Sequence, residues 1–318
     1  MDEKQKRGFP PVLQASGKSL SVAWENTVLE LADKGLVYLR GDPDDLGEQI
    51  EAVMRTTVEN PDAEPFSHRK GGTNAIMAPL LDYYMEIMGA KDSWVKDFSD
   101  PTDQRWDYMY HERLGSWPSP KSPSDQIEWA IKRLIERPFS RRTNIITWYP
   151  PRDMEARHTP CLQRLWFQIV PGGLDMHDEF RSRNALNASF GNLQGLYILG
   201  CHVRDKVEEA TGQHLNLRMI DYTNSFHVSS HDYSPFLGVV KDIRKMIGEG
   251  KGLEERTFTR DLVVQTLVED REQVESVILR QTEKHFPGDM GQEKERVHAI
   301  GDRIFYLLEK YGDKKYGS

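Results

Sequence analysis

The fold is decided by one stretch of the chain, Glu136–Val170, which reads ERPFSRRTNIITWYPPRDMEARHTPCLQRLWFQIV. It contains a pair of arginines, Arg141 and Arg142, and a Pro-Cys step that ends at Cys161. The apolar run that follows, Leu165–Val170, predicts a buried strand. A lone cysteine is usually a buried, inert thiol. A cysteine just before a buried strand, however, lies at the edge of a rigid sheet, where a nucleophile can be held still.

The composition is that of a globular protein with one large core or two small ones. The 318 residues are 38% hydrophobic and 29% charged. The net charge of −8 argues against a general nucleic-acid-binding surface. Cysteine occurs twice, as Cys161 and Cys201, which argues against a disulfide scaffold and fits a reducing, cytoplasmic compartment. The N-terminus has no apolar signal region, no run approaches membrane-spanning length, and no spacing is typical of metal ligands.

Hydrophobic spacing predicts the remaining elements. Residues 1–18 are expected to form a flexible arm, and residues 36–58 a strand, a turn and a second strand. Further strands are predicted over 143–149 and 174–180. The predicted helices are Ser21–Lys34, a helix over 125–138 capped by Ser124, Leu193–Ala210, and two amphipathic helices over 262–281 and 293–312.

The distance of about 20 residues between the arginine pair and Cys161 resembles the thymidylate synthase superfamily, which places a double arginine at that distance before a Pro-Cys nucleophile. The resemblance covers residues 20–240 and is most specific between 125 and 235. It implies an α/β (α+β) fold of three layers, with a large mixed sheet at a homodimer interface. The implied organisation is a catalytic domain over 19–250, followed by a helical C-terminal extension, residues 251–318, packed on the same domain.

The resemblance also assigns the phosphate-binding residues and the nucleophile. Cys161 takes the place of the nucleophile. Arg181 and Ser182 match the Arg-Ser pair that grips the nucleotide phosphate, for which a guanidinium is suited because it offers a bidentate fork to an oxyanion. Arg141 and Arg142 match arginines that reach across the dimer interface to the partner's phosphate.

Base and sugar contacts are implied further along the chain. Asn192 comes ten residues after Ser182, at the place of the family's base-reading asparagine, whose amide offers a donor and an acceptor. Nearby, Gly191 and Asn184 depart from the family's phenylalanine and aspartate. A second motif, His-x-Tyr, holds the deoxyribose hydroxyl in the family, and it is present here as His227 followed by Ser229 in place of the tyrosine.

The first half of the chain supplies the other implied residues. Arg40 lies in the first loop, where the family has a phosphate-binding arginine. Asp82 takes the place of a catalytic glutamate seven residues before Gly89, and Glu86 is a fallback one helical turn further along the same face. A carboxylate here would organise waters that carry protons to and from the pyrimidine ring. Tyr110 matches an active-site tyrosine.

The implied reaction is one-carbon transfer to a pyrimidine. A thiolate that adds at C6 makes C5 nucleophilic, and the implied electrophile is the methylene of 5,10-methylenetetrahydrofolate. We expect a pyrimidine nucleotide 5-hydroxymethylase that acts on a pyrimidine nucleoside 5′-monophosphate, dUMP first. The methylating members end in an apolar closing tail, whereas this chain ends in EKYGDKKYGS, and an open lid would admit water. The alternatives are a thymidylate synthase, a dCMP or CMP hydroxymethylase, and an inactive nucleotide-binding relative.

Overall fold

The computed structural model describes residues 8–42, 45–71, 77–117, 124–285 and 290–312. The strands are β1 Val12–Gly17, β2 Leu36–Asp42, β3 Asp45–Val58, β4 Ser67–His68, β5 Asn144–Ile146, β6 Leu162–Val170, β7 Gly173–Phe180, β8 Arg183–Asn184, β9 Leu217–Val228 and β10 Thr257–Phe258. The helices are α1 Leu20–Lys34, α2 Met77–Ile87, α3 Tyr110–Gly115, α4 Gln126–Glu136, α5 Pro150–Asp153, α6 Ser189–Thr211, α7 Ser230–Gly248, α8 Leu253–Arg256, α9 Arg260–His285 and α10 Met290–Lys310, with a 3-10 turn, η2, over Asp92–Trp94.

The described strands form a mixed sheet of eight strands. Its main path is β1-β3-β9-β7-β6-β5, with β2 paired to β3 and β8 paired to β9. The pairs β1–β3, β7–β9 and β8–β9 are parallel, and the others in this sheet are antiparallel. A separate ribbon joins β4 to β10, which lie far apart in the sequence. The α/β fold with a large mixed sheet, expected from the sequence, is therefore confirmed.

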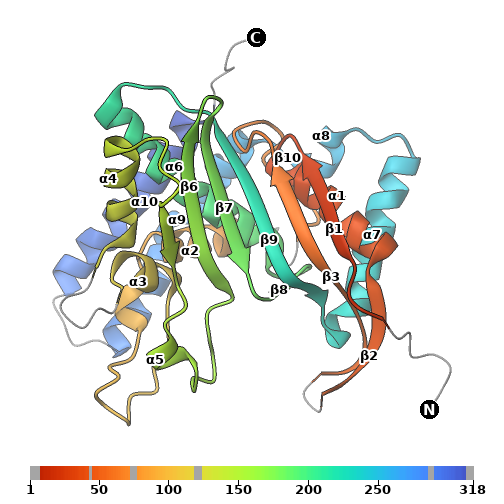
Figure 1. Ribbon diagram of the computed structural model, residues 1–318, viewed down its shortest axis with the longest axis horizontal. Coiled ribbons are helices and arrows are strands. Elements are labelled where there is room, and N and C mark those ends of the chain that lie inside the picture. Colours follow the sequence, from red (N-terminus) through yellow and green to blue (C-terminus); the bar gives the residue numbers. More distant parts are fainter. Residues whose placement is uncertain (1–7, 43–44, 72–76, 118–123, 286–289, 313–318) are drawn as a thin grey trace.

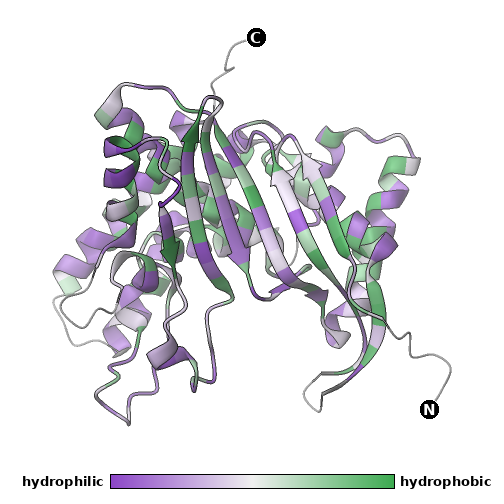
Figure 2. Cartoon of the chain, in the orientation of Figure 1, coloured by the Kyte–Doolittle hydropathy of each residue, from purple (hydrophilic) through white to green (hydrophobic). Residues whose placement is uncertain are grey.

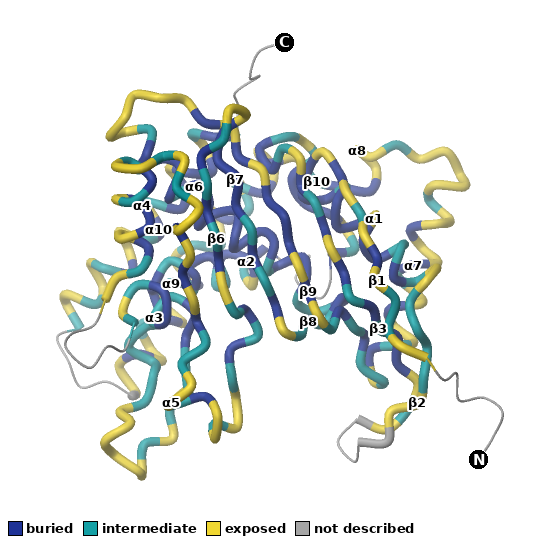
Figure 3. Tube along the Cα trace, viewed as in Figure 1, coloured by how far each residue is buried: buried dark blue, intermediate teal, exposed yellow. Residues whose placement is uncertain are grey.

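The sheet has one buried face and one open face. Along β6, Leu165, Phe167 and Ile169 are at most 2% exposed, whereas Trp166 and Gln168, which lie between them, are not buried. This period of two places apolar residues against the helices and polar or aromatic residues on the other side, as the alternating colours along the strands indicate (Figure 2). Helices lie behind the sheet and at its sides, and no described helix crosses its front (Figure 1). The buried residues follow the central strands and the helices behind them (Figure 3).

The N-terminal segment differs from the prediction. Val12–Gly17 form β1, which pairs with β3 along its whole length, so the flexible arm expected over 1–18 is wrong for this part. Leu13 is buried beneath α1, although its neighbour Val12 is 81% exposed. A single inward-facing apolar residue gives almost no periodic signal, and the hydrogen bonds of an edge strand come from residues distant in sequence. Residues 1–7 lie outside the described part.

Three element boundaries also differ from the prediction. The N-cap of α4 is Asp125 and not Ser124, because the Asp125 carboxylate accepts a hydrogen bond from the backbone of Glu128 at 2.8 Å. The strand expected over 143–149 is limited to β5, since Pro150 and the residue after it have no N–H and begin α5. Helix α6 starts at Ser189, four residues before the predicted start, so Asn192 lies within its first turn.

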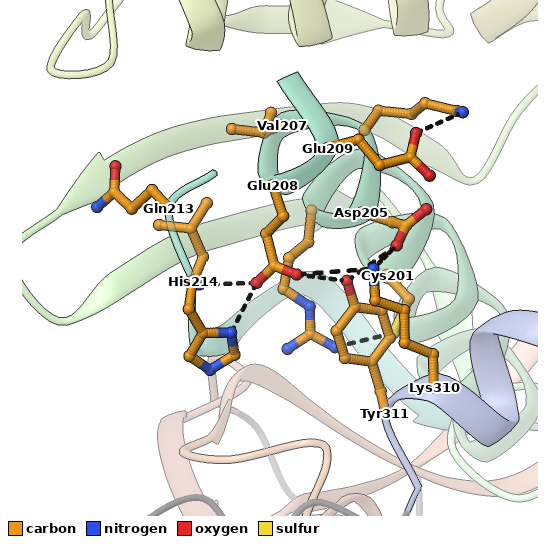
Figure 4. A network of polar contacts seen from close by, with 12 residues as sticks. Cys201, Asp205, Val207, Glu208, Glu209, Gln213, His214, Lys310 and Tyr311 are labelled. Atoms are coloured by element: carbon orange, nitrogen blue, oxygen red, sulfur yellow. Dashed lines mark hydrogen bonds and ion pairs between the residues drawn. The ribbon is translucent and has the colours of Figure 1, made fainter. Parts of the chain in front are cut away.

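The last helix, α10, is tied to α6 by a polar network around a buried aspartate. Asp205 of α6 is fully buried and accepts hydrogen bonds from Arg303 at 2.6 Å, from Lys310, and from Tyr311 at 3.3 Å. Figure 4 shows Lys310 and Tyr311 directed toward Asp205 and Glu208, with Cys201 nearby. Cys201 is fully buried, as expected for a core thiol. None of the described helices is long and apolar enough to cross a membrane.

Candidate functional site

Cys161 lies immediately before β6, whose first residue, Leu162, pairs with Phe180 at the end of β7. Its thiol is free and half-buried. The preceding loop is braced by Arg181, whose Nε donates to Pro160 O at 3.1 Å and whose Nη2 donates to Thr159 O at 3.0 Å. The Arg181 backbone N–H also donates to Cys161 O at 2.9 Å. The residue predicted to bind phosphate therefore also holds the cysteine loop in place.

Two tyrosines of the segment before α4 border the cysteine. The backbone N–H of Leu162, the residue after Cys161, points at the Tyr110 hydroxyl at 3.4 Å. The rings of Tyr108 and Tyr110 meet edge to face, with centroids 5.5 Å apart. Burial and the nearby Cys161 thiolate raise the pKa of Tyr108 to about 12, and burial raises the pKa of Tyr110 well above its usual value. Both hydroxyls therefore stay protonated, and they can donate hydrogen bonds beside the thiol.

The two candidate carboxylates of α2 share one lysine. Lys91 Nζ lies 2.7 Å from Asp82 Oδ2 and 3.4 Å from Glu86 Oε2, and its side chain is 7% exposed. The Asp82 side chain is 39% exposed and that of Glu86 is 21% exposed. Burial raises the pKa of Glu86, and its charge is felt by Tyr108. Glu86, the fallback in the sequence prediction, thus lies deeper and closer to the tyrosines than Asp82.

Asn192 is held by a tyrosine that the sequence analysis did not single out. Its Nδ2 donates to the Tyr83 hydroxyl at 2.7 Å, across the α2–α6 contact. The Tyr83 ring lies over Gly195, where an added Cβ would come within 2.4 Å of the ring. The sequence offered one signal for this contact, a glycine one helical turn after Asn192 that leaves room for a ring. It could not identify the ring, because Tyr83 lies 109 residues from Asn192 in the sequence.

The departure from the family's aspartate at Asn184 has a local explanation. Asn184 Nδ2 donates to Asp232 Oδ2 at 2.8 Å, while its Oδ1 accepts from the backbone N–H groups of Leu186 and Asn187, each at 2.9 Å. An aspartate at position 184 would place a second carboxylate against the nearly buried Asp232. An amide, which both donates and accepts, satisfies all three contacts.

His227 and Ser229 lie at the same end of the sheet as Cys161. His227 is opposite Asn184 in the parallel β8–β9 pair, and its carbonyl accepts from the Ala185 backbone at 2.7 Å. Ser229 is the N-cap residue of α7. Because β8 begins directly after Ser182, the predicted phosphate pair and the predicted sugar residues are brought together by one strand pairing.

Arg40 lies near the tip of the β2–β3 hairpin, opposite Gly47. An added Cβ on Gly47, which has a φ of +141°, would come within 2.9 Å of Ser230 Cβ, so the hairpin lies against the start of α7. The exposed Arg40 is therefore on the same side of the molecule as Ser229 and His227.

Arg141 and Arg142 lie elsewhere, just before the edge strand β5. Both are exposed, and the Arg141 carbonyl accepts from Trp166 Nε1 at 3.0 Å on the open face of the sheet. With Arg133 and Arg137 they line an open pocket of about 700 Å³. Within the described chain they precede β5, which pairs with the middle of β6, whereas Cys161 precedes the start of β6; the assignment of the two arginines to a partner's site stays a prediction.

The chain is similar to known thymidylate synthases in sequence and in fold. A sequence model described as "Thymidylate synthase" matches residues 80–216, which include Cys161 and Asn192 but not Arg40, His227 or Ser229. A Methanothermobacter marburgensis protein named "Putative thymidylate synthase" is 31% identical over 218 residues, 67% of this chain and 93% of the relative. A Methanosarcina acetivorans protein of the same name is 29% identical over 228 residues, 71% of this chain and 94% of the relative.

A solved structure shows the same fold. The thermostable thymidylate synthase A from Bacillus subtilis superposes with a TM-score of 0.50 at 14% identity, covering 70% of this chain and 84% of that one. The superfamily resemblance inferred from the sequence is therefore confirmed.

Proposed function

Since the chain belongs to the thymidylate synthase family and is a one-carbon transferase, we propose that it is a pyrimidine nucleotide 5-hydroxymethylase. Its substrate is a pyrimidine nucleoside 5′-monophosphate, with dUMP preferred, and its one-carbon donor is 5,10-methylenetetrahydrofolate. The observation that carries this proposal is the position of Cys161, which is half-buried, braced by Arg181 and bordered by the Tyr110 hydroxyl.

The residues around Cys161 fit a reduced folate. A pterin is flat and carries N–H donors. Tyr108 lies beside Cys161 and offers a ring for stacking, and we propose that the 59% exposed Trp106, two residues earlier, and the partly exposed carboxylate of Asp82 complete the folate site. When bound, the folate supplies a one-carbon unit at the oxidation level of formaldehyde.

In the proposed reaction the Cys161 thiolate adds to C6 of the base, and the C5–C6 double bond becomes a nucleophile at C5. After C5 has formed its bond to the one-carbon unit, Glu86 accepts the C5 proton through water, with Asp82 and Lys91 beside it. Loss of tetrahydrofolate leaves an exocyclic methylene on C5. Water then adds to that methylene as the C6–S bond breaks, which releases the hydroxymethyl nucleotide and regenerates the thiolate.

The polar groups near Cys161 favour hydration of the exocyclic methylene over its reduction to a methyl group. The hydroxyls of Tyr83, Tyr108 and Tyr110 and the Glu86 carboxylate lie near one another, and Cys161 lies near Tyr108 and Tyr110. Hydroxyl and carboxylate groups can form hydrogen bonds to water, which is the nucleophile that a hydroxymethylase needs and that a methylating enzyme must exclude. The second candidate is a thymidylate synthase, favoured by the names of the similar archaeal proteins.

The nucleotide contacts follow the sequence assignment. Arg181 and Ser182, with Arg40, bind the phosphate, His227 and Ser229 face the sugar, and Asn192 reads the base. We further propose that the protein is a homodimer, in which Arg141 and Arg142 reach the partner's phosphate. The open sheet face supports this, because it carries a row of rings, with Trp166 and His177 centroids 4.8 Å apart, and a helix-free aromatic surface is suited to a second copy.

The nucleophile is tested by Cys161→Ser. We expect turnover to fall by at least about a thousandfold, because an unactivated serine hydroxyl is a far weaker nucleophile than a thiolate. Nucleotide affinity, measured by calorimetry, should change less than about threefold, because the phosphate and base contacts come from other residues. Near-normal turnover of the variant would exclude a covalent mechanism.

A further inference from the structure

Tyr83 lies beside Asn192, and the proposed reaction assigns no chemical step to it. It lies on α2, and its hydroxyl accepts an N–H of Asn192 at 2.7 Å. The ring is close-packed on α6, because an added Cβ at Gly195 would overlap its Cε1 at 2.4 Å and its Cδ1 at 2.7 Å. The position of the Tyr83 ring and its contact with Asn192 are therefore fixed by α2 and α6, two helices that are distant in sequence.

In the structure this contact goes with one orientation of the Asn192 amide, in which Nδ2 faces the Tyr83 hydroxyl. Asn192 lies in the first turn of α6, where its backbone N–H donates to Ala188 O at 2.9 Å. An asparagine amide has two N–H donors and one carbonyl acceptor. With one N–H committed to Tyr83, the carbonyl and the other N–H remain on the opposite edge of the amide. Burial and the nearby Glu86 raise the pKa of the Tyr83 hydroxyl, which therefore stays neutral.

The exposed edge of the amide matches one base better than the other. Uracil presents an N3–H donor and an O4 acceptor, which pair with a carbonyl and an N–H side by side. Cytosine presents the reverse pattern. To read cytosine, Asn192 must flip, and Tyr83 must also rotate its hydroxyl from accepting an N–H to donating to Oδ1. Two side chains, and not one, would have to reorient.

We infer that Tyr83 is a specificity-determining residue, which acts through Asn192 to favour a uracil nucleotide over a cytosine nucleotide. The inference rests on the proposed function, since it requires that Asn192 faces the base. It makes Tyr83 a positioning residue, because its hydroxyl binds the reading amide and not the substrate.

The test compares Tyr83→Phe with the wild type. For both, kcat/KM is measured with dUMP and with dCMP, and the affinity for each nucleotide is measured by calorimetry in a Cys161→Ser background. The loss of one buried hydrogen bond should lower the dUMP:dCMP preference by about fivefold to tenfold in both measurements. Tyr84→Phe is the matched control. Its hydroxyl is buried and has no hydrogen-bond partner within the described part of the chain, so its removal should leave the preference unchanged.

A second variant reaches the same contact from the other helix. Gly195→Ala displaces the Tyr83 ring without touching the hydroxyl or Asn192, and it should shift the preference in the same direction. A folded Tyr83→Phe protein whose preference stays within twofold of the wild type would overturn the inference while leaving the proposed function intact. A wild type that binds neither nucleotide would contradict the proposed function itself, and the inference with it.

Discussion

At the scale of single residues, the identity of the proton-handling carboxylate is the point on which the structure adds most to the sequence. Counting from Gly89 assigns this role to Asp82. Asp82 is paired with Lys91 and is 39% exposed, whereas Glu86 is less exposed and has a pKa that burial raises. A carboxylate with a raised pKa is the better proton acceptor and donor near neutral pH.

We therefore expect Glu86→Gln to lower kcat by about a hundredfold or more, the usual range for loss of a general acid–base group. Asp82→Asn is the control on the same helix and should lower kcat by about tenfold or less. Glu86 must be ionised to accept a proton, so kcat should rise with pH through its raised pKa, and this limb should vanish in Glu86→Gln. A larger loss in Asp82→Asn than in Glu86→Gln would return the role to Asp82.

Some of these residues were readable from the sequence and others were not, for a physical reason. The place of Cys161 directly before a buried strand could be predicted from the sequence, because a cysteine followed by an apolar run is a local pattern. From the sequence, Asn184 was only a departure from the family's aspartate, because its hydrogen-bond partner, Asp232, is 48 residues away. Tyr83 was not singled out, because aromatic residues in a helix are usually core and its hydroxyl partner comes from another helix; the one local signal, Gly195, does not identify the tyrosine that packs on it. Local sequence patterns predict where helices and strands lie, whereas the contacts of the site residues come from elements that are distant in sequence.

At the scale of elements, the segment after residue 250 is joined to the first helix by a buried ion pair. Glu25 of α1 accepts hydrogen bonds from Arg256 of α8, at 2.9 Å to each oxygen, and lies 2.9 Å from His68 Nε2 of β4. Burial alone would raise the pKa of Glu25, but the contacts with His68 and Arg256 outweigh it and lower the pKa from 4.5 to about 2. The ribbon of β4 and β10 closes over the same contact.

This contact should make stability depend on acid pH. A carboxyl whose pKa is lowered by folding stabilises the fold above its unfolded pKa, and the contribution is lost as the pH falls from about 4.5 to about 2. At pH 7, Glu25→Gln should lower the free energy of unfolding by about 3 kcal/mol, measured by urea denaturation. The difference from wild type should shrink steadily below pH 4.5.

Glu30→Gln on the same helix is the control. Its ion pair with Lys34 is largely exposed, with the lysine side chain 61% accessible, and such pairs contribute less than about 0.5 kcal/mol. Equal effects of the two substitutions, or a Glu25→Gln effect that persists at pH 2, would mean that the buried pair does not stabilise the fold.

At the scale of the whole molecule, the proposed dimer would explain both the open sheet face and the two exposed arginines. Arg141 and Arg142 lie beside that face, and the Arg141 carbonyl binds Trp166 on it. If two copies pack face to face, each copy's arginines can reach the partner's phosphate site, and neither site is complete in a monomer.

Mixing two inactive variants tests this arrangement. Arg142→Ala damages the partner's site, and Cys161→Ser damages its own, so a mixed dimer keeps one intact site. After denaturation and joint refolding, equal amounts should recover roughly a quarter of wild-type activity, since half of the dimers are mixed. Refolding each variant alone is the control. Mixed dimers that form but stay inactive would place the arginines outside the partner's site.

The central claim is covalent one-carbon transfer that ends in hydration, and the mass of the product tests it most directly. The protein is incubated with dUMP and 5,10-methylenetetrahydrofolate, and the nucleotide is analysed by mass spectrometry, with Cys161→Ser as the blank. The account predicts a nucleotide heavier by CH₂O, formed only by the wild type, together with tetrahydrofolate. A nucleotide heavier by CH₂, together with dihydrofolate, would contradict hydration and identify a thymidylate synthase. An unchanged nucleotide would contradict one-carbon transfer to dUMP.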